Sequence, residues 1–222
     1  MLYAAIRLII SPLARLIFRP TIEGRDNVPK HGGVIIASNH LSFIDSVLIP
    51  IVAPRPVVFI AKKEYWTGTG IKGALSRAWF TAMQSIPIER DTHGAAQASL
   101  DAALSVLKNG QAFGIYPEGT RSRDGRLYRG KTGVGWLALT AQVPVVPCAV
   151  IGTDKLLPIG AKFPRFADVR VRFGTPLTFP PPGTGTTAAQ ARRAATDEVM
   201  AAIAAMSPQE LAGVYNIAPQ SS

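Results

Sequence analysis

The sequence predicts an α/β domain whose sheet is largely parallel or mixed and is flanked by helices. Short apolar runs rich in β-branched residues recur along the chain, and stretches of helical periodicity separate them. This alternation is typical of strand–helix–strand units. The runs of strand length cover residues 34–37, 57–61, 86–88, 112–116, 143–150 and 169–173. The helical candidates between them cover residues 43–52, 71–83, 95–108 and 132–141.

Turn residues divide the rest of the chain. Asn109 and Gly110 predict the end of the third helix, because this pair stops helices readily. The run Pro180-Pro181-Pro182-Gly183 predicts a turn before an alanine-rich helix over residues 188–206. We therefore expect one domain over residues 23–206, within the ordinary size range, and a polar tail over residues 207–222.

Residues 1–22 predict an amphipathic segment. Three arginines interrupt the apolar run, so it lacks the ~18 uncharged residues of a spanning helix. On a helical wheel the aliphatic residues share an arc of about 120°, opposite the arginines. The aliphatic residues are Leu2, Ile6, Ile9, Ile10, Leu13, Leu16 and Ile17, and the arginines are Arg7, Arg15 and Arg19. This pattern favours a helix lying in a membrane interface, and docking onto the protein's own core remains the alternative.

The charge balance limits the classes of partner. Lys and Arg number 24 against 14 Asp and Glu, which leaves a net charge of +10. Such an excess indicates an anionic partner: nucleic acid, an acidic membrane surface or a phosphorylated substrate. The single cysteine excludes an internal disulfide, and with only three histidines we expect no metal site.

Polar residues follow two of the apolar runs. Ligands of α/β sheets gather beyond the carboxyl ends of strands, so these residues are candidates for a site. His40 follows the first run, and Asp45 stands five positions later, where its carboxylate could orient the imidazole as a general base. The alternative is a helix-capping Asp beside an ordinary loop histidine. Arg121 and Lys131 belong to a basic run after residue 116, and arginine matches phosphate geometry.

Four segments together carry a resemblance. NHLSFID, IPIER, YPEGTRS and VPVVP, in this order, resemble the four blocks of the glycerolipid acyltransferase family, which includes the lysophosphatidate acyltransferases. The resemblance implies a sheet like that of glycerol-phosphate acyltransferases. It also implies transfer of a fatty acyl group from a thioester (acyl-CoA or acyl carrier protein) to the free hydroxyl of lysophosphatidate. No acyl-enzyme is expected.

The resemblance also implies roles for residues. His40 would be the general base and Asp45 would orient it. The residues expected to hold the acceptor phosphate are Arg90 and Arg121, to which charge and proximity add Lys131. The residues expected to position the acceptor are Asn39, Glu118, Gly119 and Thr120.

The second block departs from the family pattern, which leaves the acceptor open. The family often has a glycine before this block and an aromatic residue and Asp within it, whereas this chain has Gln84, Pro87 and Glu89. Glycerol 3-phosphate, another lysophospholipid or a glycolipid is the alternative acceptor. A non-catalytic basic module for lipid or nucleic acid is the alternative from another class. We expect no cofactor besides the acyl donor, no nucleic-acid partner, and a peripheral or monotopic position on the cytoplasmic face of the cell membrane.

Overall fold

A computed structural model describes residues 19–83, 85–89, 94–161 and 163–217. Most of the amphipathic segment predicted for residues 1–22 therefore lies outside the described residues. Arg90, predicted to bind phosphate, also lies outside them.

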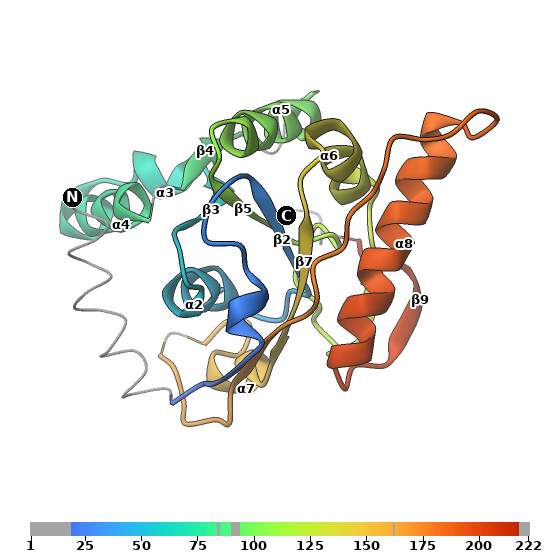
Figure 1. The fold of residues 1–222 in the computed structure, drawn as a ribbon. Helices are drawn as coiled ribbons and strands as arrows, with labels where there is room; N and C mark the ends of the chain where they lie inside the picture. Colours follow the sequence, from blue (N-terminus) through green and yellow to red (C-terminus); the bar gives the residue numbers. More distant parts are fainter. Residues whose placement is uncertain (1–18, 84, 90–93, 162, 218–222) are drawn as a thin grey trace.

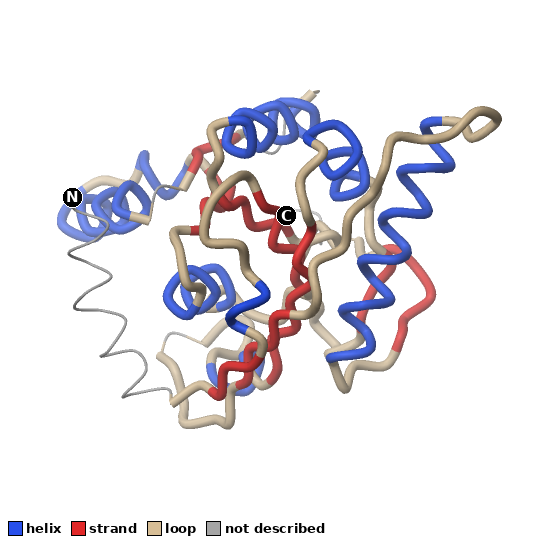
Figure 2. The backbone as a smooth tube through the Cα atoms, viewed as in Figure 1, coloured by secondary structure: helices blue, strands red, loops and turns tan. Residues whose placement is uncertain are grey.

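A seven-stranded sheet forms the centre of the molecule (Figures 1 and 2), in the order β1-β8-β7-β2-β5-β3-β4. All neighbouring strands run parallel except β7 and β8, which are antiparallel. The predicted largely parallel or mixed sheet is confirmed. The strands are β1 (Thr21–Glu23), β2 (Val34–Ser38), β3 (Val57–Lys62), β4 (Ile86–Ile88), β5 (Ala112–Ile115), β7 (Val145–Ile151) and β8 (Arg170–Phe173).

Helices cover both faces of this sheet. Along β2, Val34 and Ile36 pack into one core cluster, whereas Ile35 and Ala37 pack into the other, as the two-residue period of a strand requires. Helices α2 and α7 contribute to the first cluster, and α5, α6 and α8 contribute to the second (Figure 1). The helices are η1 (Arg25–Asn27), α2 (Asp45–Val52), α3 (Glu64–Thr67), α4 (Gly70–Ala82), α5 (Ala95–Lys108), α6 (Gly133–Ala141), α7 (Thr153–Leu156) and α8 (Ala188–Met206).

The segment expected as a polar tail needs a correction. Residues Leu211–Tyr215 form strand β9, which pairs in parallel with β6 (Leu127–Arg129) in a separate two-stranded sheet. This strand could not be predicted from the sequence, because four of its five residues are exposed and it therefore lacks the apolar alternation of a core strand.

The topology brings three loops to one edge of the sheet. Strands β2, β5 and β7 are parallel neighbours, so their carboxyl ends at Ser38, Ile115 and Ile151 share that edge. The loops that follow carry the first and third sequence blocks and α7. None of the helices in the described part of the chain is long and apolar enough to cross a membrane.

Candidate active site

His40 and Asp45 meet in the turn between β2 and α2. Oδ2 of Asp45 lies 2.9 Å from Nδ1 of His40 and accepts the backbone N–H groups of Leu41 and Ser42 at 2.8 Å each. The Asp45 side chain is fully buried, whereas that of His40 is 14% exposed. With a proton on Nδ1 directed at the carboxylate, Nε2 of His40 carries the free lone pair. The structure thus brings the predicted pair together in the geometry of a base and its orienting carboxylate.

A tyrosine ring stacks against the imidazole of His40. The ring of Tyr116, directly after β5, stacks on the His40 ring with centroids 3.8 Å apart and planes 8° apart. Its hydroxyl lies 2.9 Å from Oγ of Ser46, and the ring of Phe59 stacks on it with centroids 5.3 Å apart. Burial, followed by the nearby charge of Asp45, raises the pKa of Tyr116 well above its usual value. His40 therefore rests on a neutral aromatic surface that fixes its ring plane.

Glu118 joins the third block to the first. One carboxylate oxygen accepts the backbone N–H of His40 and the other accepts that of Tyr128, both at 2.9 Å. The side chain is fully buried, and burial raises the pKa of Glu118 to about 7. A further bond runs from the N–H of Ser122 to the carbonyl of His40 at 2.7 Å. The two loops therefore form one hydrogen-bonded unit.

Lys131 lies across Gly119. The backbone of Gly119 has φ +79°, and a Cβ there would stand 3.0 Å from Nζ of Lys131. The N–H of Lys131 donates to the carbonyl of Pro117 at 2.8 Å, which fixes where its side chain starts. Within the described residues, neither the Lys131 ammonium nor the Arg121 guanidinium pairs with a carboxylate. Both cations are therefore available to an anionic ligand.

Asn39 is buried beside the site with every polar atom of its side chain engaged. Its amide exchanges two hydrogen bonds with the backbone of Val150, at 2.8 and 2.9 Å, and donates to Oε1 of Gln209 at 2.6 Å. Both carboxylate oxygens of the buried Glu118 likewise accept a backbone N–H. The predicted roles of these two residues in positioning the acceptor must therefore act through the loops they hold, because neither carries a free polar atom toward the surface.

Residues 207–217 hold the third block from outside, which the sequence did not indicate. Gln209 donates to the carbonyl of Gly125 at 2.8 Å, and the Asn216 amide donates to the carbonyls of Thr120 and Arg121 at 3.4 and 3.2 Å. No local motif could have marked these residues, because each partner is at least 84 positions away. Tyr116 was also missed, although its place at a strand end was a usable signal.

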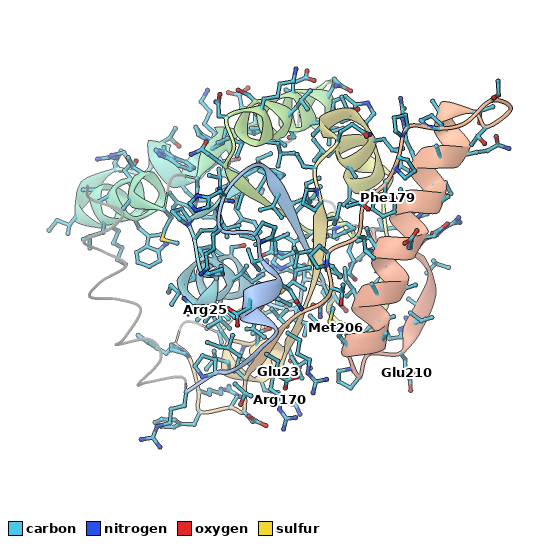
Figure 3. The ribbon with its side chains drawn as sticks, viewed as in Figure 1. Glu23, Arg25, Arg170, Phe179, Met206 and Glu210 are labelled. Carbon is cyan, nitrogen blue, oxygen red and sulfur yellow. The ribbon has the colours of Figure 1, made fainter. Side chains whose placement is uncertain are left out.

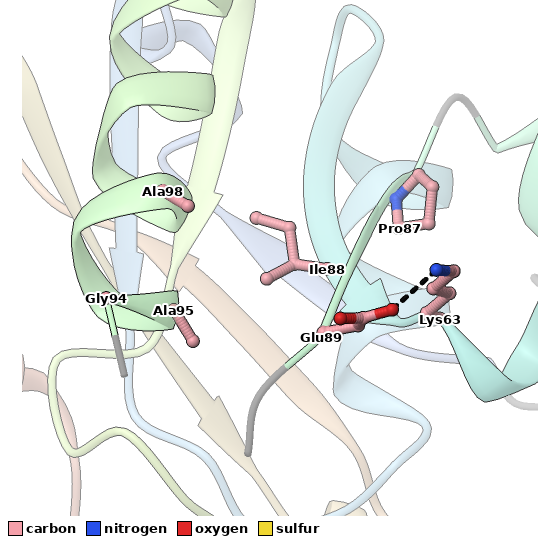
Figure 4. A pocket seen from close by; sticks show the side chains of 7 residues that line it. All are labelled: Lys63, Pro87, Ile88, Glu89, Gly94, Ala95 and Ala98. Carbon is pink, nitrogen blue, oxygen red and sulfur yellow. Dashed lines mark hydrogen bonds and ion pairs between the residues drawn. The ribbon is translucent and has the colours of Figure 1, made fainter. Parts of the chain in front are cut away.

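The second block ends in a surface pocket. The pocket, of about 520 Å³, lies between β4 and the first turn of α5 (Figure 4). Glu89 and Lys63 point toward one another on the side of the pocket opposite α5, as an exposed ion pair (Figure 4). Arg90 follows Glu89 in the sequence but, as noted, lies outside the described residues.

The neighbouring hydroxyl and thiol groups are occupied or inert. Oγ of Ser42 donates to the carbonyl of Leu157 at 2.6 Å, and Ser46 is bonded to Tyr116. Cys148 is buried, and burial raises the pKa of its thiol to about 12. Within the described residues, three or more His, Cys, Asp or Glu side chains nowhere gather as a metal-ligand set. What the geometry offers is a base with an orienting carboxylate, next to free cations.

The fold and the His40–Asp45 pair are those expected from the resemblance to acyltransferases, and comparison with known proteins agrees with this class. Residues 19–151 match the family model described as Acyltransferase, and this segment includes all four blocks and most of the sheet. The chain belongs to the acyltransferase family.

Individual relatives carry a more specific name. The chain is 34% identical over 157 residues to a 1-acyl-sn-glycerol-3-phosphate acyltransferase of Limnanthes douglasii, covering 70% of this chain and 53% of that one. It is 27% identical over 158 residues to the enzyme of that name from Bacillus subtilis, covering 70% of this chain and 72% of the relative. The chain spans about half the length of the plant relatives that it matches.

A solved structure shares the fold. The crystal structure of the 1-acyl-sn-glycerophosphate (LPA) acyltransferase PlsC from Thermotoga maritima superposes with a TM-score of 0.67 at 25% identity. The match covers 92% of this chain and 79% of that one. The similarity therefore extends beyond the segment matched by the family model.

Proposed function

We propose that this protein transfers a fatty acyl group from a thioester to the free hydroxyl of lysophosphatidate and so forms phosphatidate. The single observation that carries this proposal is the His40–Asp45 pair, oriented at 2.9 Å next to unpaired cations. The names of the relatives support lysophosphatidate as the acceptor. Acyl-CoA and acyl carrier protein both remain candidate donors.

The chemistry assigned to His40 is general base catalysis. Nε2 takes the proton of the acceptor hydroxyl as its oxygen bonds to the thioester carbonyl carbon. The tetrahedral intermediate then collapses, the carbon–sulfur bond breaks, and the proton on Nε2 passes to the leaving thiolate. Asp45 stabilises the imidazolium between these steps. The acyl group passes directly to the acceptor, in keeping with the occupied state of the neighbouring serines.

The unpaired cations are assigned to the acceptor phosphate. Arg121 offers a planar fork of donors and Lys131 a compact charge, and both stand on the loop that Glu118 ties to His40. Arg90 is proposed as a third phosphate ligand on the strength of the sequence resemblance. Gly119, which lies against Lys131, and Thr120 are assigned to the glycerol part. Asn39 and Glu118 are assigned an indirect role, as supports of the two loops.

The reaction needs only its two substrates, so we propose no cofactor besides the acyl donor and no metal. Because the acceptor is a lipid, we propose that the protein works on the cytoplasmic surface of the cell membrane, with the amphipathic segment in the interface; residues 21 and 22 of the predicted segment 1–22 belong to β1 instead. The net charge of +10 favours an anionic surface there.

A panel of acceptors offered with both donors tests this function. We expect thiol release with lysophosphatidate and loss of activity of 10²-fold or more in His40→Ala. The matched control is His31→Ala, an exposed histidine outside the site, which keeps full activity. Preference for another acceptor by kcat/KM would transfer the activity to that compound. Intact turnover in folded His40→Ala would refute the assigned mechanism.

A further inference from the structure

Three large apolar side chains stand exposed on one short loop between α7 and β8. Over residues 158–168, Phe166 is 99% exposed, Phe163 is 80% exposed and Ile159 is 40% exposed. Single exposed apolar residues are ordinary, but clustered aromatic residues at the surface mark an interaction site. The free energy of an exposed phenylalanine ring falls when the ring enters an apolar environment.

This loop lies at the same edge of the sheet as His40. It follows the carboxyl end of β7 and leads into β8, whose first residue, Arg170, pairs with Ile151 at the end of β7. The residue just before the loop is held to the His40–Asp45 turn, since Oγ of Ser42 donates to the carbonyl of Leu157. Phe166 also lines a cavity of about 710 Å³ that Leu41, the residue after His40, lines as well. A surface that receives Phe163 and Phe166 would therefore lie against the candidate active site.

The start of the described chain reaches the same place. Strand β1 pairs in parallel with β8, with Thr21 opposite Arg170, and the N–H of Thr21 donates to the carbonyl of Val169 at 2.9 Å. Figure 3 shows Glu23 and Arg170 together at this edge. The described part of the chain therefore begins, at Arg19, beside the end of the loop that carries Phe163 and Phe166.

The charges around the loop favour an anionic partner. From Asp154 to Arg170 the sequence carries four basic and two acidic residues. One of the acidic residues, Asp168, forms an ion pair with Arg170, whereas Lys155 and Arg165 are exposed and form no ion pair within the described residues. Arg19 adds a further exposed cation just before β1. Aromatic side chains flanked by free cations match a bilayer with anionic headgroups.

We propose that residues 158–161 and 163–168 dock on an anionic lipid bilayer, with Phe163 and Phe166 among the acyl chains and Lys155 and Arg165 at the headgroups. This docking orients the edge of the sheet that carries His40 toward the membrane. The inference rests on the proposed function only in that a lipid acceptor gives the docking its purpose. Vesicle binding itself is independent of turnover.

Sedimentation with vesicles, without substrate, tests the proposal on the full chain. The vesicles contain phosphatidylcholine alone or mixed with phosphatidylglycerol. We expect Phe163→Ser/Phe166→Ser to lower the partition coefficient on the mixed vesicles about tenfold or more. The matched control, Leu211→Ser/Val214→Ser, removes exposed apolar area from β9 and leaves binding at the wild-type level. Equal binding by the loop variant and the wild type would overturn the proposal, whether or not acyl transfer is found.

A second measurement reports insertion directly. Phe166→Trp should shift its emission to shorter wavelength when mixed vesicles are added, relative to the background of the three native tryptophans. No shift would overturn the proposal. An acyl carrier protein is the other partner that such a loop could bind. If the loop double variant lost binding to that protein but kept vesicle binding, the surface would be a protein-docking site and the bilayer proposal would be wrong.

Activity then separates this inference from the proposed function. With a short-chain lysophosphatidate in free solution, the loop double variant should equal the wild type, and on vesicle-borne acceptor it should be about tenfold slower. If the wild type were inactive on both substrates, the proposed function would be refuted, but the vesicle-binding result would still hold. Equal rates on vesicles for the variant and the wild type would count against the docking.

Discussion

The carboxylate of Glu118 accepts the backbone N–H of His40 at 2.9 Å, across 78 positions of sequence. Its second oxygen accepts the backbone N–H of Tyr128 at the same distance, so one buried side chain joins the His40 turn to the basic loop, residues 117–131, which carries Arg121 and Lys131. An error in the conformation of either loop would leave a buried N–H unsatisfied, which costs about 1–3 kcal/mol.

Stability should depend on pH through Glu118. Burial raises the pKa of Glu118 from 4.5 in the reference state to about 7, so the folded protein takes up a proton between these values. The free energy of unfolding contributed by this group is therefore fully present below about pH 4.5 and is lost as pH rises through about 7. Relative to wild type, the free energy of unfolding of Glu118→Gln, which cannot titrate, should rise by up to about 3 kcal/mol between pH 5 and 8, from a lower value at pH 5 because its NH2 group cannot accept the second backbone N–H. Urea unfolding at several pH values measures this, and parallel curves for the two proteins would contradict it.

The stack of Tyr116 on His40 should matter more than the tyrosine hydroxyl. Tyr116→Phe keeps the ring at 3.8 Å and loses only the bond to Ser46, so we expect kcat within about threefold of wild type. Tyr116→Leu removes the flat surface that fixes the imidazole plane, and we expect kcat to fall about tenfold or more. Steady-state kinetics on both variants makes the comparison. Equal losses would assign the effect to the hydroxyl.

Asp45→Asn should impair the chemical step and leave acceptor binding intact. The amide oxygen can still accept the bond from His40, but it no longer stabilises the imidazolium. The expected loss in kcat is about 10²–10⁴-fold, with the KM for the acceptor little changed. Circular dichroism serves as the control for folding, since the same side chain holds Leu41 and Ser42 at the start of α2. A raised KM with normal kcat would instead place Asp45 in binding.

Two glycines provide a matched test of Lys131. Gly119 and Gly125 have similar backbone conformations, with φ of +79° and +81°, so alanine at either should cost about 1 kcal/mol of stability. Only at Gly119 would the new Cβ meet Lys131, because nothing lies within 4 Å of the position at Gly125. We expect Gly119→Ala to raise the acceptor KM about tenfold and Gly125→Ala to leave it unchanged. Equal KM values for the two variants would remove Lys131 from the phosphate site.

Most of the fold could be predicted from local sequence patterns. Helices α5 and α8 begin and end where their periodicity and flanking turn residues predict, and the buried strands are apolar on both faces. Strands β1, β6 and β9 were missed because they are short and mostly polar or exposed, and their pairing partners lie far away in the sequence.

The site was predictable only where its residues are close in sequence. The spacing of His40 and Asp45 placed both in one turn, and their contact follows from that turn. The burial of Asn39 and Glu118 was not predictable, because it depends on Val150, Gln209 and Tyr128, which other elements deliver. A sequence motif does not distinguish polar residues that face a ligand from polar residues that support the backbone behind it.

The hold of residues 207–217 on the basic loop also sets an order of events during synthesis. Gln209 leaves the ribosome 84 residues after Gly125, the residue whose carbonyl it binds, and Asn216 follows later still. The strands of the main sheet up to β8 can pair before then, whereas the loop that carries Arg121 must wait for its last partners. A nascent chain can therefore pair the strands of its main sheet before it can hold a phosphate, so it gains its proposed activity late, when most of its folding is already complete.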